Sequence, residues 1–404
     1  MRCGLDQLTA GTRGALRRRL RDARVGLLTH AAAVDRRGRS AIAVLDELGA
    51  APSLVFAPEH GLDGLAQAEE AVADPEQDEA GPRVVSLYGR ARDSLTPKPE
   101  DLAQLDVLVV DLVDVGSRYY TYVWTALLAL RAAAAAGVHS VVLDRPNPIA
   151  GDPATLEGAP QRQDYCSFVG LEPLPIRHAL TVGELLALFL ERDGRPLGPD
   201  GALSIVPCIG WERQRTAAAW HRPFSPPSPN MPTVETALVY PGGCLLEGTN
   251  LSEGRGTTLP FQLVGAPFLN GELLCRELGA RGLPGFQVRP ARFRPTFEKH
   301  AGSICSGVLL QVTDPTSFKP VSTYATLIAL ARSLAPEQFV FLDRPYEFET
   351  EKPAFDLLTG GPDARALLER GGSPEELVEL LQPVPSEWRD EVLRAEARVL
   401  AAQA

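Results

Sequence analysis

The chain lacks an excess of basic residues and any cysteine pattern that is typical of a metal site. Its 404 residues include 40 Lys and Arg against 51 Asp and Glu, which gives a formal net charge of −11. Because nucleic-acid binding depends on clustered positive charge, we expect no nucleic-acid partner. The six cysteines form no Cys-x-x-Cys pair, so we expect no zinc and no other metal. Scattered cysteines in a chain of this size favour a reducing compartment over a disulfide framework.

Long apolar runs are also missing. No stretch of about 18 apolar residues occurs, so we expect neither a membrane span nor a membrane partner. A basic segment, residues 17–24, precedes the apolar residues 25–33 and faintly resembles a signal peptide, but the apolar part is short and contains His30. We interpret it as a first core strand and expect a cytoplasmic protein.

The glycine-rich loops of nucleotide-binding proteins are absent as well. No Gly-x-Gly-x-x-Gly follows the first expected strand, and no Walker A sequence occurs anywhere in the chain. A dinucleotide needs such a loop because its pyrophosphate approaches the backbone closely. We therefore expect no cofactor.

What the sequence does have is a regular alternation of short apolar runs and amphipathic segments. Ser40 can cap a helix that continues to about residue 48, and residues 125–136 are rich in Ala and Leu. Continuous apolar strands with helices between them indicate a parallel sheet covered on both faces. We predict an α/β fold with a doubly wound, Rossmann-like sheet, whose strands are residues 25–32, 54–57, 84–87, 106–112 and 140–143.

The composition changes near a proline-rich loop at residues 223–232. Beyond it we expect a strand at residues 308–312 and helices near residues 324–333 and 374–381. The sequence therefore predicts a Rossmann-like domain over residues 1–240. A smaller α+β accessory domain is expected over residues 241–404.

Polar clusters follow three of the predicted strands directly. They are residues 58–61, 114–122 and 144–148. Each loop alone could be an ordinary turn whose polar groups are satisfied. Because ligands bind outside the carboxyl ends of the strands in open parallel sheets, the three loops together favour a binding site.

These loops belong to a series of motifs that resembles one bacterial enzyme family. The chain is similar to the exo-acting β-N-acetylmuramidases, long described as a domain of unknown function. It departs from their pattern at His30, where the family usually has Asn. The matching motifs are PEHG (residues 58–61), SLYG (86–89), DVGSRYYTY (114–122), LDRPNP (143–148), EGA (157–159), SFVG (167–170), PSPNMPT (227–233), LEGTNLSEGRGTT (246–258) and PTFEKH (295–300).

The resemblance implies a glycoside hydrolase with its active cleft between a Rossmann-like catalytic domain and the smaller domain. It would release terminal β-linked N-acetylmuramic acid from peptidoglycan-derived fragments, in cell-wall turnover or recycling. The expected partner is thus a small carbohydrate. Two alternatives stay open: a related amino-sugar hydrolase of different specificity, and a non-catalytic muropeptide-binding protein that uses the same cleft.

Glycoside hydrolysis needs a proton donor and a group that stabilises a cationic sugar centre. The resemblance places the catalytic acid at Glu59, where burial would keep the carboxyl group protonated. The second group stays open among Glu247, Glu253 and Asp114. The 2-acetamido group of the substrate could also act as the nucleophile, with help from a carboxylate or a tyrosine.

N-Acetylmuramic acid carries a lactyl carboxylate, which a planar guanidinium matches with two hydrogen bonds. Three arginines lie in the matched loops and are candidates for this contact, although each could instead hold a neighbouring carboxylate. His60 is a candidate for orienting Glu59. The full set of substrate-binding candidates is His60, Arg118, Tyr120, Tyr122, Arg145, Asn147, Asn230, Asn250 and Arg255.

Overall fold

The large sheet of the protein has six parallel strands in the order β3-β2-β1-β4-β5-β6, as seen in a computed structural model that describes residues 1–74 and 81–403. This order is that of the doubly wound Rossmann fold, so the predicted fold class is confirmed. The strands are β1 (Val25–Thr29), β2 (Leu54–Ala57), β3 (Arg83–Ser86), β4 (Val107–Asp111), β5 (His139–Leu143) and β6 (Leu203–Val206).

The sixth strand, β6, is missing from the sequence prediction. Its four residues are all buried, but the polar Ser204 interrupts the apolar run. This hydroxyl is accommodated because it lies 3.0 Å from Nε2 of His139 on the neighbouring strand β5. A tertiary contact therefore replaces the apolar side chain that the sequence pattern requires.

Helices cover both faces of this sheet because successive strand residues point to opposite sides. On one face, side chains such as Leu27 and Val109 pack with α1 (Gly4–Thr9), α2 (Gly14–Arg21) and α3 (Ala41–Glu47). On the other face, Leu28 and Val110 pack with α4 (Pro99–Leu102), α5 (Tyr122–Ala135) and α6 (Val182–Arg192). Helix α3 begins as predicted, since the Ser40 hydroxyl accepts a hydrogen bond from the Ala43 amide.

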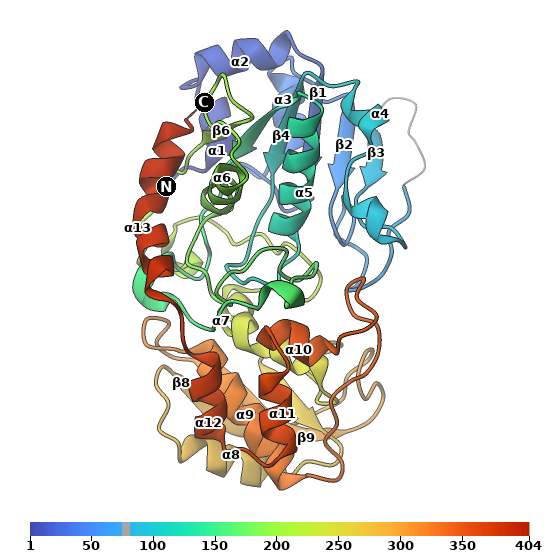
Figure 1. The fold of residues 1–404 in the computed structure, drawn as a ribbon, viewed down its shortest axis with the longest axis vertical. Helices are drawn as coiled ribbons and strands as arrows, with labels where there is room; N and C mark the ends of the chain where they lie inside the picture. Colours follow the sequence, from blue (N-terminus) through green and yellow to red (C-terminus); the bar gives the residue numbers. More distant parts are fainter. Residues whose placement is uncertain (75–80, 404) are drawn as a thin grey trace.

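The second part of the chain forms a smaller layer below the large sheet (Figure 1). Its antiparallel sheet has the order β7-β9-β8. The strands are β7 (Leu263–Ala266), β8 (Phe286–Phe293) and β9 (Cys305–Val312). The helices are α7 (Val234–Gly243), α8 (Gly271–Gly279), α9 (Pro320–Leu334), α10 (Ala354–Thr359), α11 (Asp363–Glu369) and α12 (Pro374–Leu381).

The last helix, α13 (Ser386–Ala401), returns to the large sheet and packs against α6 (Figure 1). Residue Gln403 then pairs with Ile205 beside β6. The first and last residues of the described chain therefore lie on the same side of the molecule. Among the residues described, no helix is both long and apolar enough to cross a membrane.

Candidate functional site

A cavity with ≈ 430 Å³ of empty space lies where the carboxyl ends of the large sheet meet the smaller layer. Its walls come from the loops after β2 and β4, from the proline-rich loop, and from two segments of the second half of the chain. Six of the residues singled out in the sequence line it: Glu59, His60, Tyr120, Asn230, Glu247 and Arg255. Loops far apart in the sequence thus converge on one site.

Glu59 is buried at the end of strand β2 and receives hydrogen bonds from two sides. The Thr121 hydroxyl donates to Oε2 at 2.6 Å, and the Glu69 amide donates to Oε1 at 3.4 Å. The Nε2 atom of His60 lies 4.0 Å from Oε1. Such donors fix the carboxyl group in place.

His60 lies next to Glu59 in the cavity, and its role in orienting that carboxyl group stays a prediction. It adopts a left-handed backbone conformation with φ 70°, directly before Gly61 with φ 77°, so the chain turns sharply after Glu59. Its Nδ1 lies 2.8 Å from the carbonyl oxygen of Ala66, which requires a hydrogen on Nδ1. The other ring nitrogen is thereby turned toward Glu59.

On the opposite wall, Glu247 and Arg255 form an ion pair. Nη2 of Arg255 lies 2.7 Å from Oε1 of Glu247, and the Tyr346 hydroxyl donates to Oε2 at 2.6 Å. Burial opposes the positive charge of Arg255, but the carboxylates of Glu247 and Glu253 outweigh it and raise the pKa of the guanidinium. Arg255 is therefore a permanently charged group on the cavity wall.

Glu253 does not line the cavity. Its carboxylate lies behind Arg255, with Nε of Arg255 at 3.3 Å and Nζ of Lys299 at 2.7 Å. Burial alone would raise its pKa, but the two cations, first Lys299 and then Arg255, lower it. The carboxylate therefore braces the wall, and the catalytic role of Glu253 stays a prediction.

Asp114 also lies outside this cavity. It closes the turn after β4, where its Oδ2 accepts a hydrogen bond of 2.7 Å from the Gly116 amide. The same oxygen lies 3.5 Å from Nε2 of His178. The carboxylate shapes the loop, and a catalytic role for Asp114 stays a prediction.

Arg118 is buried, and both of its terminal nitrogens donate to backbone carbonyl oxygens, while its contact with a substrate carboxylate stays a prediction. Nη1 donates to the carbonyl oxygens of Ala159 and Leu174 at 3.0 and 2.9 Å. Nη2 donates to Leu358 at 2.6 Å. These bonds connect the loop after β4 to α10 and thereby fix the backbone of a loop that lines the cavity.

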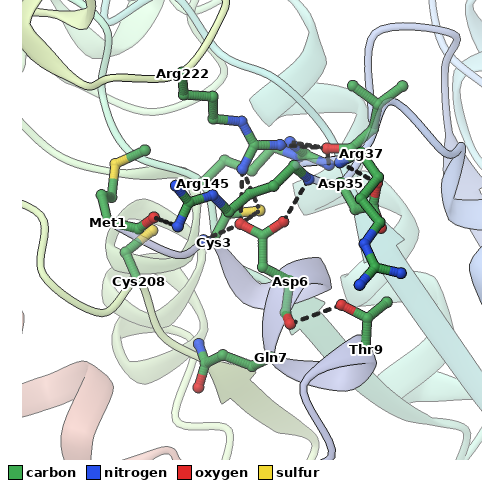
Figure 2. A network of polar contacts seen from close by, with 12 residues as sticks. Met1, Cys3, Asp6, Gln7, Thr9, Asp35, Arg37, Arg145, Cys208 and Arg222 are labelled. Carbon is green, nitrogen blue, oxygen red and sulfur yellow. Dashed lines mark hydrogen bonds and ion pairs between the residues drawn. The ribbon is translucent and has the colours of Figure 1, made fainter.

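Arg145 is likewise committed elsewhere. Its guanidinium forms a two-bond ion pair with Asp111 on β4, at 2.5 and 2.9 Å, and donates to the Val34 carbonyl oxygen. It lies beside a polar network in which Arg222 joins Asp6 near the start of the chain (Figure 2). The contact between Arg145 and substrate stays a prediction.

Asn147 and Tyr122 hold the loops around the site. Oδ1 of Asn147 accepts from the Ile149 amide at 3.0 Å, and Nδ2 donates to the Leu180 carbonyl oxygen at 3.0 Å. The Tyr122 hydroxyl donates to the Pro227 carbonyl oxygen at 2.9 Å, which anchors the proline-rich loop. The polar atoms of both residues contact backbone groups, and their role in substrate binding stays a prediction.

The two remaining asparagines differ from each other. Asn250 spans the Gln338 carbonyl oxygen and the Val340 amide at 2.8 and 3.0 Å and does not line the cavity, so its role in substrate binding stays a prediction. Asn230 lines the cavity, and its Nδ2 donates to Oε1 of Gln67 at 2.9 Å. Its carbonyl oxygen is therefore placed to accept a hydrogen bond from a ligand.

Tyr120 is the aromatic candidate that reaches the cavity. Its ring packs against those of Tyr122 and Tyr240, with centroids 4.8 and 6.1 Å away. Burial, more than the neighbouring charges, raises the pKa of its hydroxyl, although the Ser228 hydroxyl nearby opposes this. Tyr120 therefore stays a neutral hydrogen-bonding group at physiological pH.

Glu347 is a buried residue that lines the same cavity, and it is absent from the sequence-based predictions. It lies between α9 and α10, outside the predicted strands and the family motifs. The Tyr88 hydroxyl donates to its Oε2 at 2.8 Å. Its one sequence signal is weak: Tyr88 belongs to the SLYG motif, but only the fold shows what Tyr88 touches.

Family models match most of the chain in two adjacent pieces. Residues 25–235 match the exo-β-N-acetylmuramidase NamZ N-terminal family, and residues 238–395 match the NamZ C-terminal family. The peptidoglycan β-N-acetylmuramidase NamZ of Bacillus subtilis (strain 168) is 41% identical over 366 residues. That alignment covers 90% of this chain and 84% of the relative.

Two solved structures from Bacteroides fragilis NCTC 9343, both of DUF1343 family proteins, have a similar fold. One has a TM-score of 0.83 and 28% identity, and the match covers 98% of each chain. The other has a TM-score of 0.67 and 24% identity, covers 100% of this chain and 98% of its own, and supports the fold alone.

Proposed function

The chain belongs to the exo-β-N-acetylmuramidase NamZ family, and we propose that it hydrolyses the bond of terminal β-linked N-acetylmuramic acid in peptidoglycan-derived fragments. The observation that carries this proposal is the placement of Glu59. Its carboxyl group lines the cavity where the loops of the large sheet meet those of the smaller layer. The Thr121 hydroxyl and the Glu69 amide hold it in one orientation, as a reacting group requires.

The chemistry of the cavity wall suits an amino sugar. Three carboxyl groups, those of Glu59, Glu247 and Glu347, face a space that also contains Arg255 and Asn230. A glycosidase needs one carboxyl group that protonates the leaving oxygen and another group that stabilises the cationic sugar centre. Amide and hydroxyl groups on the wall can bind the sugar hydroxyls and the acetamido group.

Arg255 is the arginine that we propose for the lactyl carboxylate. A guanidinium has five N–H donors. The ion pairs with Glu247 and Glu253 engage Nη2 and Nε, so Nη1 still offers donors toward the cavity. The two neighbouring carboxylates also hold the guanidinium plane in a fixed direction, which favours a carboxylate with matching geometry.

We further propose that the enzyme acts in the cytoplasm, on fragments that are recycled. Support comes from the six cysteines, all of which are free thiols. Free thiols in a chain of this size are typical of a reducing compartment. Cell fractionation with an antibody against the protein tests this part, and recovery outside the cytoplasm would refute it.

The activity is tested with two chromogenic substrates, the 4-nitrophenyl β-glycosides of N-acetylmuramic acid and of N-acetylglucosamine. We expect nitrophenol release from the first and little from the second. Glu59→Gln should keep the fold and lose about 10²–10⁴-fold in turnover, the usual contribution of a positioned acid–base group. The matched control is Glu70→Gln, an exposed carboxylate on the same loop. Near-normal activity of folded Glu59→Gln contradicts the assignment.

A further inference from the structure

Glu347 reaches the cavity on an unusual turn. Glu347 and Phe348 both adopt left-handed backbone conformations, with φ 47° and 64°. The turn is closed by two hydrogen bonds between Tyr346 and Glu349, each 2.9 Å long. Two consecutive left-handed residues define a hairpin turn that Asn and Gly normally occupy, so this conformation is costly for Glu and Phe. Strain of this kind is retained where a side chain must point in one direction.

The turn belongs to the second half of the chain but packs against residues of the first half. The Phe348 ring packs on the rings of Tyr88 and Phe168, with centroids 5.2 and 5.8 Å away. The segment between α9 and α10 rises beside the loops that follow β2 and β3 (Figure 1). Glu347 is thereby brought into the same buried cavity as Glu59.

The two carboxyl groups have different surroundings. Glu59 receives two hydrogen bonds, from the Thr121 hydroxyl and the Glu69 amide. Glu347 is buried and receives one hydrogen bond, from the neutral Tyr88 hydroxyl. Two carboxyl groups in one buried space do not both ionise readily, and the less well solvated of them keeps the proton.

We propose that Glu347 is the second catalytic carboxyl group and the proton donor, and that Glu59 is its ionised partner. This inference rests on the proposed hydrolysis of a muramic acid glycoside and deepens it. It gives Glu59 the carboxylate role in place of the acid role that the family resemblance implies. The surroundings of Glu347 suit a proton donor and those of Glu59 suit its partner, which are the two roles that a glycosidase needs.

The titratable neighbours of Glu347 agree with this division. Burial raises its pKa well above the usual range, and the Glu59 carboxylate adds to the rise. Glu69 and Glu247 act in the same direction, while the hydrogen bond from Tyr88 opposes it. We therefore expect the carboxyl group of Glu347 to be protonated at neutral pH.

The other carboxyl groups near the cavity are less suitable donors. Glu247 is ion-paired with Arg255 and accepts a hydrogen bond from Tyr346, so it is committed as a carboxylate. Burial raises the pKa of Glu69 to about 7, but its side chain lies at the rim and faces Arg344 at 3.6 Å. Each of these two carboxyl groups therefore has a cation beside it, Arg255 for Glu247 and Arg344 for Glu69.

In the bond-breaking step, the O–H bond of Glu347 breaks and its proton moves to the glycosidic oxygen. The electron pair of the C1–O bond leaves with that oxygen, and the positive charge at C1 faces the Glu59 carboxylate. A water molecule then adds to C1, and the proton that it loses returns to the carboxyl pair. One proton per pair is thereby restored, so no other reactant is needed.

Leaving-group dependence tests the donor role. A nitrophenolate leaves without protonation, whereas a sugar alkoxide does not. Glu347→Gln should therefore lose about 10²–10⁴-fold in kcat/KM on a β-linked N-acetylmuramyl–N-acetylglucosamine disaccharide, but about tenfold or less on the nitrophenyl glycoside. Glu59→Gln should lose activity on both substrates. The control is Glu349→Gln in the same turn, which should behave as the wild type on both.

A second variant keeps the test decisive if Glu347→Gln folds poorly. The Tyr88 hydroxyl stabilises the ionised form of Glu347, so Tyr88→Phe should move the alkaline limb of the kcat/KM profile to higher pH. Equal losses of Glu347→Gln on both substrates, or an unmoved alkaline limb in Tyr88→Phe, overturn the donor role. If the wild type cleaves neither substrate, the proposed function itself is wrong, which is a different result.

Discussion

The stability of the fold should depend on pH through Asp144, the residue that follows strand β5. Asp144 is buried and accepts hydrogen bonds from the Arg145 amide at 2.9 Å, the Thr181 hydroxyl at 2.9 Å and the Gly183 amide at 2.8 Å. Burial, and then the charge of Glu184, raise its pKa from 3.8 to about 7 against these hydrogen bonds. The folded protein therefore binds a proton that the unfolded chain releases near pH 4.

The sign and size of the effect follow from this difference. Below pH 4 the carboxyl group is protonated in both states, and its contribution to stability is fully present. Between pH 4 and pH 7 only the unfolded chain releases the proton, so the free energy of unfolding falls by about 1.4 kcal/mol per pH unit. From the shift of 3.8 to about 7, the total loss is about 4 kcal/mol, complete above pH 7.

Asp144→Asn removes this dependence, since the amide keeps an acceptor oxygen but does not titrate. Urea unfolding at pH 4 to 8 should show that the variant gains about 4 kcal/mol relative to the wild type across this range. The control is Asp106→Asn: hydrogen bonds from Arg24 lower the pKa of exposed Asp106 to about 2, so its difference from wild type should be nearly flat. Parallel curves for Asp144→Asn and the wild type would refute the reasoning.

Three further changes probe the site. Arg255→Lys should lower kcat/KM for the muramic acid glycoside about tenfold or more relative to the N-acetylglucosamine glycoside, because an ammonium cannot match a carboxylate with two bonds; equal losses would mean that Arg255 only braces Glu247. Thr121→Val removes the 2.6 Å hydrogen bond to Glu59 and should lower kcat/KM about tenfold or more, with the substrate preference unchanged. Tyr122→Phe frees the proline-rich loop and should lower the urea-derived unfolding free energy by about 1 kcal/mol; no change would contradict the anchoring role.

Much of the fold follows from local patterns in the sequence. The continuous apolar run that contains β4 and the capping serine before α3 predict those elements because burial and capping act over a few residues. The same logic places Glu59 at the edge where ligands bind, since it follows a buried strand of a parallel sheet. Helix α13 and strand β6, by contrast, depend on contacts with distant partners.

The sequence by itself determined that Arg118, Arg145 and Arg255 lie in polar loops that match the family motifs. Only the tertiary structure decided that the first two bind backbone carbonyls and Asp111, and that Arg255 faces the cavity. It also brought Glu347 to Glu59 from the far half of the chain. The physical reason is that short-range patterns fix whether a side chain is buried, whereas its hydrogen-bond partners come from segments that meet only when the chain has folded.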